Sequence, residues 1–391
     1  MIKLIRFEIH KVFGRHVIWL ILLVFLILNA MNIERHHHIF KTDRMEQGRY
    51  ELYQELCGEM TEEKIARIQE NYNAALDILN GGNYDTEYNP ERYYSGYAYG
   101  DANLWREVKE EYDRIQGYES EMTALTDSAK RMNENSALSE YYRRQNEQII
   151  NIYERRSLQQ FSRLEGVTAL SEYRLSSVLL IMLLILTAGN MYVIERENGM
   201  AEMICTARNG GMKTATAKLF ASLLITAFFC ILFYGMDIAL FMYFYRIDGL
   251  NQFIYAVPSL NGILGFAHTP LCCTVWQYFL LIVAIRLLGF CVIASVFMFF
   301  SALMRSAVFV FFSAVLFTAS MMLCYTFWNT GAGIVLNYCN PLRLLLIDFK
   351  EYEVCNFAEY PVSISMIAVF TGIAVFFLNS ILYLIAGRKR V

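Results

Sequence analysis

The residues with the clearest chemical character form a short charged run between two apolar stretches. The run Glu195–Met200 reads E-R-E-N-G-M, and Glu202 and Arg208 follow within two helical turns or so. Charged groups of both signs on a small surface are suited to electrostatic pairing with another protein. An amphipathic helix here would lie flat on the membrane surface and join two membrane helices. An ordinary charged loop is the competing interpretation, since such loops are common on the cytoplasmic side.

Motifs for catalysis and metal binding are absent from the sequence. It contains no H-E-x-x-H, C-x-x-C or G-x-S-x-G pattern. The stretch Asn209–Thr214 has two glycines and a lysine, but it lacks the Gly-Lys pair of a phosphate-binding loop. The three imidazoles of His36–His38 point in different directions on a helix and make a poor chelate. We therefore predict no enzymatic activity, no metal and no cofactor bound by this chain.

Composition places the charged run in a membrane protein. Of 391 residues, 56% are hydrophobic and only 18% are charged, whereas soluble domains have about a quarter charged. The abundant aromatic residues exclude a disordered chain, and nine cysteines are too few for a disulfide scaffold. A net charge of −3 also gives no sign of nucleic-acid binding.

The charges are distributed unevenly along the chain. Residues 34–172 contain 27 acidic and 17 basic side chains, a net charge of −10. The remaining residues contain 10 acidic and 17 basic side chains, a net charge of +7. A hydrophilic acidic block is thus inserted into an apolar and mildly basic chain.

Six apolar stretches are long enough to cross a bilayer as helices, which needs about 20 residues. The predicted fold is an all-α membrane protein with six transmembrane helices, the first at 17–33 and five more within 173–391. The five later stretches cover about 175–194, 219–245, 275–304, 307–327 and 362–386.

Short positive segments set the predicted orientation. The N-terminal segment 1–16, the segment after the second span, Arg305 and the C-terminal tail are all basic, and six spans place them on one side. We predict that this side and both termini are cytoplasmic. A cleaved signal peptide is the alternative for the first span, but the long segment before it contains Glu8, which favours an uncleaved anchor.

The block 34–172 is then a helical extracytoplasmic domain. Apolar residues at helical spacing predict helices over 42–80, 102–133 and 139–164, separated by a tyrosine-rich loop at 83–100. The first and last of these helices could continue into the neighbouring spans. Two roles stay open from sequence: a ligand-binding surface, or a support for a dimer.

Two charged residues, Asp237 and Arg286, fall within predicted spans. Charged groups in a membrane usually face protein or water, so an ion pair between adjacent helices and separate roles are both possible interpretations. Cys339 and Cys355 lie on the outer side, and the sequence does not decide whether they are bridged.

In this context the charged run resembles a known family. The run Glu195–Met200, followed by Thr206–Arg208 and Lys218, is similar to the E-R-E-x-G-[TM]…T-x-x-R…K pattern of ABC-type-2 exporter permeases. The segment Leu4–Lys11 resembles the interfacial N-terminal helix of that family, with its E-x-x-K spacing. Asn340-Pro341 resembles the N-P of the outer re-entrant region before the last span. The block 34–172 resembles the insert of a subset associated with peptide export or immunity.

The resemblance implies a function and partners. The chain would be the permease subunit of an ATP-binding cassette exporter in the cytoplasmic membrane of a bacterium, moving an amphipathic peptide, lipid-like molecule or drug. A separate ATPase subunit, which holds the ATP and Mg, would dock on a coupling helix at 195–213. The implied docking residues are Glu195, Arg196, Glu197, Gly199, Glu202 and Arg208.

Three further expectations complete this interpretation. A second copy or a related permease would complete a dimer around a central cleft. Residues 331–359, with Asn340 and Pro341, would form an outer gate. The alternatives are a membrane sensor whose outer domain binds a ligand, and a peptide-immunity component without true transport.

Overall fold

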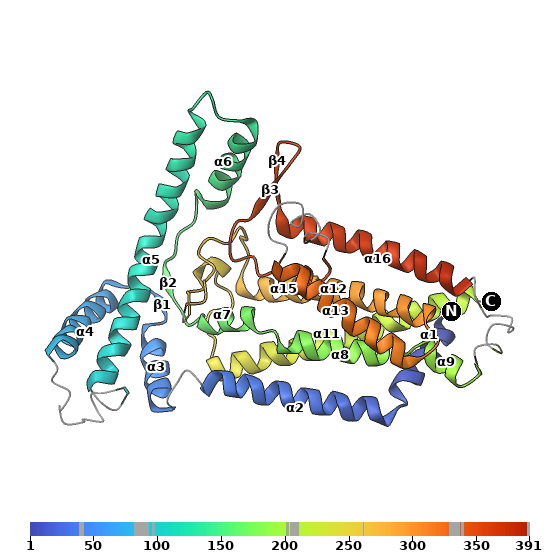
Figure 1. The fold of residues 1–391 in the computed structure, drawn as a ribbon. Helices are drawn as coiled ribbons and strands as arrows, with labels where there is room; N and C mark the ends of the chain where they lie inside the picture. The colour runs from blue at the N-terminus through green and yellow to red at the C-terminus, as the bar shows by residue number, and fades with distance from the viewer. Residues whose placement is uncertain are drawn as a thin grey trace.

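The chain forms a bundle of long apolar helices with a smaller helical domain at one end (Figure 1). The computed structural model describes residues 1–38, 43–81, 94–95, 98–200, 203, 211–260, 262–327, 337 and 340–388. Within this described part, six helical stretches are long and apolar enough to cross a membrane. They are His16–His37, Glu165–Thr187, Met212–Tyr245, Val275–Leu303, Ala307–Phe327 and Ile364–Ala386. The prediction of a helical protein with six such helices is confirmed.

The second stretch begins and ends earlier than the predicted span 175–194, at Glu165 and Thr187, and it has a break before the predicted start. It consists of α7 (Glu165–Glu172) and α8 (Leu175–Thr187), and the backbone between them is extended at Tyr173. The Tyr173 hydroxyl donates to the side-chain oxygen of Asn29 on α2 (His16–His38), at 2.8 Å. This polar contact with a neighbouring helix lies at the break. The apolar run of the sequence does not predict the contact.

The centre of the bundle is occupied by α11 (Met212–Tyr245) and α12 (Val275–Leu303), which contact each other and most of the other long helices. Half or more of their apolar stretches is buried, whereas only 11% of the apolar stretch of α13 (Ala307–Phe327) is buried. α2 and α16 (Ile364–Arg388) are also mostly exposed. In a membrane, apolar faces of this kind contact lipid or another membrane chain.

The inserted domain is helical, but two of its predicted helices are wrong in extent. The predicted helix 42–80 is two helices, because the chain turns at Gly58, where φ is +96°. The predicted helix 139–164 ends at Tyr153 and does not continue into the second span. The elements are α3 (Asp43–Leu56), β1 (Gly58–Glu59), α4 (Glu62–Gly81), α5 (Ala98–Asn133), α6 (Glu140–Tyr153) and β2 (Gln160–Phe161).

The two-residue strands β1 and β2 explain these breaks. They pair antiparallel, with Gly58 opposite Phe161, so the segment after α6 returns to the turn between α3 and α4. Phe161 is fully buried there against Leu52 and Leu56 of α3 and the face of α5. A contact between segments so far apart in the chain leaves no trace in the helical spacing of apolar residues, so the sequence did not predict it. Most of the predicted tyrosine-rich loop 83–100 lies outside the described residues.

Two connecting segments lie at the same end of the bundle as the inserted domain. One contains the 3-10 turn Ile254–Ala256, and the other contains α15 (Arg343–Leu346) and the hairpin of β3 (Val354–Phe357) and β4 (Tyr360–Ser363). Gln148 of α6 donates to the carbonyl of Pro361 in β4, at 3.2 Å. Both termini lie at the opposite end (Figure 1). This arrangement agrees with the even number of spans, although the side that faces the cytoplasm stays a prediction.

Two glycines allow α15 to pack closely into the bundle. A side-chain Cβ at Gly289 of α12 would lie 3.0 Å from the Cβ of Leu344 and 2.8 Å from Leu345. A Cβ at Gly372 of α16 would lie 2.6 Å from Leu344. Both leucines are almost fully buried. The short helix that begins just after Asn340 is therefore seated between α12 and α16.

Replacing Gly289 by valine is expected to destabilise the chain by about 1–3 kcal/mol, the usual cost of adding atoms to a packed interior. The matched control is Gly235→Val on α11, where an added Cβ would meet no atom within 4 Å. The measurement is the thermal unfolding midpoint in detergent. Equal midpoints for the two variants would show that α15 does not pack as described.

Candidate functional site

Four charged side chains from three separate segments meet at the end of the bundle that holds the termini. Glu8 and Lys11 come from α1 (Ile2–Phe13), Glu195 from α9 (Val193–Glu197), and Lys218 from the first turns of α11. The Lys218 ammonium lies 2.8 Å from Glu8 Oε2 and 2.5 Å from Glu195 Oε1. Lys11 also forms an ion pair with Glu195. We refer to these four residues as the ion cluster.

Most of the ion cluster is buried, so each of its buried charges needs an opposite charge close by. Lys218 has no exposed surface, and Glu8 and Glu195 are 4% and 3% exposed. Lys218 also lies 5.2 Å from the centre of the Tyr192 ring. Burying a charge without a partner costs several kcal/mol, whereas the two acids and two bases here neutralise one another. The three segments are therefore fixed to each other through Lys218.

The next two residues of the charged run bind different helices. Arg196 donates to the carbonyl of Ala302 at 2.6 Å and also to that of Met304, which closes the end of α12. The carboxylate of Glu197 accepts from the backbone N–H of Ala307, at 2.9 Å, and so caps the start of α13. Together Glu195, Arg196 and Glu197 connect α9 to α1, α11, α12 and α13. A displacement of α9 would act on all four helices.

A second polar group lies among the spans themselves. Asp237 of α11 accepts from the side chain of Asn29 on α2 at 2.6 Å, and Asn29 in turn accepts from Ser176 on α8 at 2.9 Å. These bonds join three membrane helices. Arg286 of α12 does not form an ion pair with Asp237, since no carboxylate oxygen of the described residues lies within 4.0 Å of its nitrogens. Arg286 instead packs against the ring of Tyr234, at 5.0 Å.

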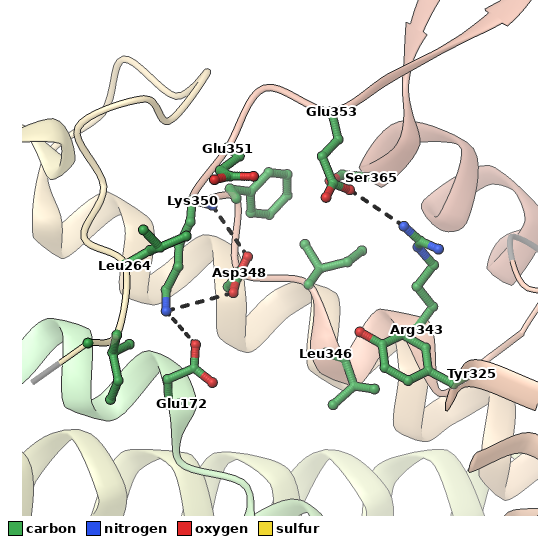
Figure 2. A pocket seen from close by; sticks show the side chains of 14 residues that line it. Glu172, Leu264, Tyr325, Arg343, Leu346, Asp348, Lys350, Glu351, Glu353 and Ser365 are labelled. Carbon is green, nitrogen blue, oxygen red and sulfur yellow. Dashed lines mark hydrogen bonds and ion pairs between the residues drawn. The ribbon is translucent and has the colours of Figure 1, made fainter. Parts of the chain in front are cut away.

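At the opposite end lies an open cavity of about 590 Å³ (Figure 2). Lys350 pairs with Glu172 and lies 4.0 Å from Asp348, and Arg343 lies 3.6 Å from Glu353. Leu264, Leu346 and Tyr325 supply apolar surface beside these groups. Charged pairs above an apolar wall suit a ligand that is itself amphipathic.

The comparisons with known proteins found no similarity: no family model matches the chain, and no curated protein or solved structure matches it. The fold and the ion cluster therefore rest on the residues described above. The family resemblance of the charged run stays a prediction.

The structure places the predicted docking residues in different environments. Glu195 is buried and paired, so its carboxylate is not available to a partner in this state. Arg196 is engaged within the chain, whereas Glu197 is exposed at the end of the bundle. Gly199 has φ of +68°, a backbone conformation that glycine adopts readily. Glu202 and Arg208 lie outside the described residues, so the predicted helix 195–213 is described only at its two ends.

The predicted outer-gate residues stabilise α15. Asn340 is buried, donates to the carbonyl of Met321 on α13 at 2.7 Å, and accepts from the backbone of Leu342 at 3.0 Å. Pro341 follows it immediately before α15. Asn340 therefore attaches the segment to α13, and the gating role stays a prediction. Cys339 lies outside the described residues, so the bridge to Cys355 that the sequence left open is not tested.

Three members of the ion cluster were absent from the predicted site residues. Glu8 and Lys11 are spaced three apart on a helix that precedes the first span, and Lys218 is a lone cation at the edge of the third. A lysine at a span edge normally extends its ammonium into water. Lys218 is buried because Glu8 and Glu195 lie close to it in space. The order of residues along the chain does not reveal this closeness.

Proposed function

We propose that this chain is the permease subunit of an ATP-binding cassette exporter in the cytoplasmic membrane of a bacterium. The observation that carries the proposal is the ion cluster, in which the charged run is fixed to the N-terminal helix and to the central helix α11. A separate ATPase can act on the membrane helices only through a surface that is rigidly connected to them. The E-R-E run provides that connection at the end of the bundle that holds both termini.

The proposed mechanism follows from these contacts. The docking surface is the exposed face around α9, which includes Glu197, Met200 and Met203. When the ATPase subunits move, α9 moves with them, and the ion cluster carries α1 and α11 along. The ends of α12 and α13 follow through Arg196 and Glu197. Since α11 and α12 form the centre of the bundle, their displacement would change access to the cavity at the other end.

The substrate of this transporter is proposed to be amphipathic. The cavity in Figure 2 combines paired charges with apolar side chains, which matches a molecule with one polar and one apolar part. A second copy of the chain, or a related permease, would pair through the exposed apolar helices. The inserted domain would then lie outside the cell.

Replacing Glu197 by lysine is expected to lower co-purification of the ATPase subunit roughly tenfold, because like charges brought together at an interface cost several kcal/mol. Glu197 also caps α13, so Glu197→Gln is the matched control: its amide oxygen can still accept from Ala307 N–H. The measurement is recovery of a P-loop ATPase with the tagged chain from its native membranes. Wild-type recovery with Glu197→Lys would contradict docking at α9.

A membrane sensor is the second candidate function, and the outer cavity favours it, because a ligand could bind there without being transported. The two proposals differ in their partners. A sensor requires no ATPase, so a chain that is purified intact from native membranes without any ATPase would support the sensor.

A further inference from the structure

Arg286 is a buried guanidinium that forms no hydrogen bond or close ion pair with the described residues. It is 4% exposed and packs over the ring of Tyr234, whose centre lies 5.0 Å away. Its Nε–H is buried and donates to no acceptor among the described residues. Arg286 lies eleven residues into α12 from Val275, which is about 16 Å along a helix. A charge at such a depth is usually paired or faces a polar ligand or water.

The groups around Arg286 do not neutralise it. The nearby hydroxyl of Tyr234 is bonded to Ser177 at 2.8 Å, and that of Tyr278 donates to the carbonyl of Asp348 at 3.0 Å. Asp237 interacts electrostatically with Arg286, but its carboxylate is bonded to Asn29 and lies more than 4.0 Å from the guanidinium. Tyrosine ring faces attract a cation but do not neutralise its charge.

A second arginine increases the positive charge at this place. Arg174, between α7 and α8, interacts electrostatically with Arg286, and its Nη1 is buried without a partner among the described residues. Its other nitrogen is 3.8 Å from Glu172, and Lys350 binds the same carboxylate. Glu172 and Asp348 both lie beside Lys350 and interact with Arg174. Arg286 interacts with the carboxylate of Asp237 only across more than 4.0 Å, so among the described residues no acid contacts its guanidinium directly.

A small cavity of about 20 Å³ lies beside Arg286, between α7, α11 and α12. This is room for about one water molecule or one oxygen atom. A water in it could accept one hydrogen bond but would leave the charge uncompensated. The half-buried Ile238 and Val283 form part of its wall, so the rest of a larger anion would lie toward the outside of the bundle.

We propose that Arg286 binds the anionic group of an amphipathic molecule, a carboxylate or a phosphate, with one oxygen in this cavity and the apolar part against α11 and α12. The planar guanidinium matches both oxyanions. The source is either a lipid of the bilayer or a molecule that the protein carries. The site needs only the folded chain, so it stands or fails independently of ATPase docking.

The test is equilibrium binding to the purified full chain in a neutral detergent. The probes are dodecyl phosphate and dodecanoate, with dodecyltrimethylammonium and inorganic phosphate as comparisons. Arg286→Gln is expected to weaken both anionic amphiphiles about tenfold or more, because it removes a charge-assisted hydrogen bond. Arg286→Lys keeps the charge without the planar group and is expected to weaken them less. The exposed Arg106 provides the matched control, Arg106→Gln.

The outcomes are distinct. Unchanged affinity for dodecyl phosphate in folded Arg286→Gln and Arg286→Lys chains would overturn the site, as would equal binding of the cationic amphiphile. Equal affinity for inorganic phosphate would overturn the amphipathic part. If Arg286 serves only to balance Asp237, the anionic amphiphiles would bind in Asp237→Asn but not in the wild type, which would also overturn the proposal; we expect both chains to bind them.

The source of the anion is decided in a bilayer. The chain is placed in nanodiscs of phosphatidylcholine with or without phosphatidylglycerol, and retained lipids are counted by native mass spectrometry. Phosphatidylglycerol retained by the wild type and lost in Arg286→Gln would support a bilayer lipid. Binding of the dodecyl probes with no selective lipid retention would support a carried molecule.

Discussion

Replacing Lys218 by methionine is expected to lower the free energy of unfolding by about 3–5 kcal/mol, the usual cost of removing one partner from a buried ion pair. Methionine has a similar length and would fill much of the same volume. The loss therefore arises from charge: Glu8 and Glu195 would remain buried with only Lys11 between them.

Two further variants separate this explanation from a packing effect. The double variant Lys218→Met/Glu195→Gln leaves one acid and one base in the ion cluster and is expected to recover at least about half of the loss, since charge balance returns. Lys3→Met removes an exposed lysine from the same N-terminal helix and is expected to change stability by less than about 0.5 kcal/mol. Thermal unfolding in detergent measures all three. A double variant less stable than Lys218→Met would show that charge balance is not what stabilises the cluster.

The sequence predicted the long helices well because their signal is local. Twenty apolar residues in a row can satisfy their backbone only as a helix in lipid, whatever the rest of the chain does. The same logic failed in the inserted domain, where the turn at Gly58 and the end of α6 at Tyr153 depend on the pairing of β1 with β2. That pairing joins residues about a hundred positions apart, and helical periodicity carries no information about it.

The sequence drew attention to Glu195, Arg196 and Glu197 as a docking surface, and that role stays a prediction. Their contacts with α1, α11, α12 and α13 were not predicted. The prediction treated all three as surface groups, because charged side chains are rarely buried. Glu195 is buried because Lys218 and Glu8 approach it from other helices. Within one short run, Glu195 therefore faces the interior, Arg196 is half-buried and Glu197 faces the surface.

Hydrogen bonds from side chains to backbone carbonyls join the inserted domain to the bundle. Tyr118 and Tyr153 each donate to a carbonyl of the segment before α12, those of Ala267 and His268. Burial raises the pKa of Tyr153 to about 12, so its phenol stays protonated and can donate at any physiological pH. This interface is one connection between the inserted domain and the membrane helices, beside the contact of Gln148 with Pro361. Its central residue is Arg156.

Replacing Arg156 by alanine is expected to loosen this interface by about 3 kcal/mol, which is roughly a hundredfold in an opening equilibrium. Arg156 is 4% exposed and donates to the carbonyls of Thr269 and Leu271, at 2.7 and 3.2 Å. Its guanidinium also lies between the rings of Tyr153 and Tyr255, at 4.8 and 4.9 Å. Truncation would leave both carbonyls without this donor and open a void between the two rings.

The neighbouring Arg155 provides the matched control, because it has the same chemistry but is exposed. Hydrogen–deuterium exchange of peptides that cover 254–274 is the measurement: about hundredfold faster exchange is expected in Arg156→Ala, and almost none of that change in Arg155→Ala. Equal exchange in the two variants would show that the tyrosines hold the interface without Arg156. A selective effect of Arg156→Ala with unchanged exchange near Lys218 would show that the two ends of the bundle are stabilised independently. Movement driven at the ion cluster would then have to reach the inserted domain through α11 and α12.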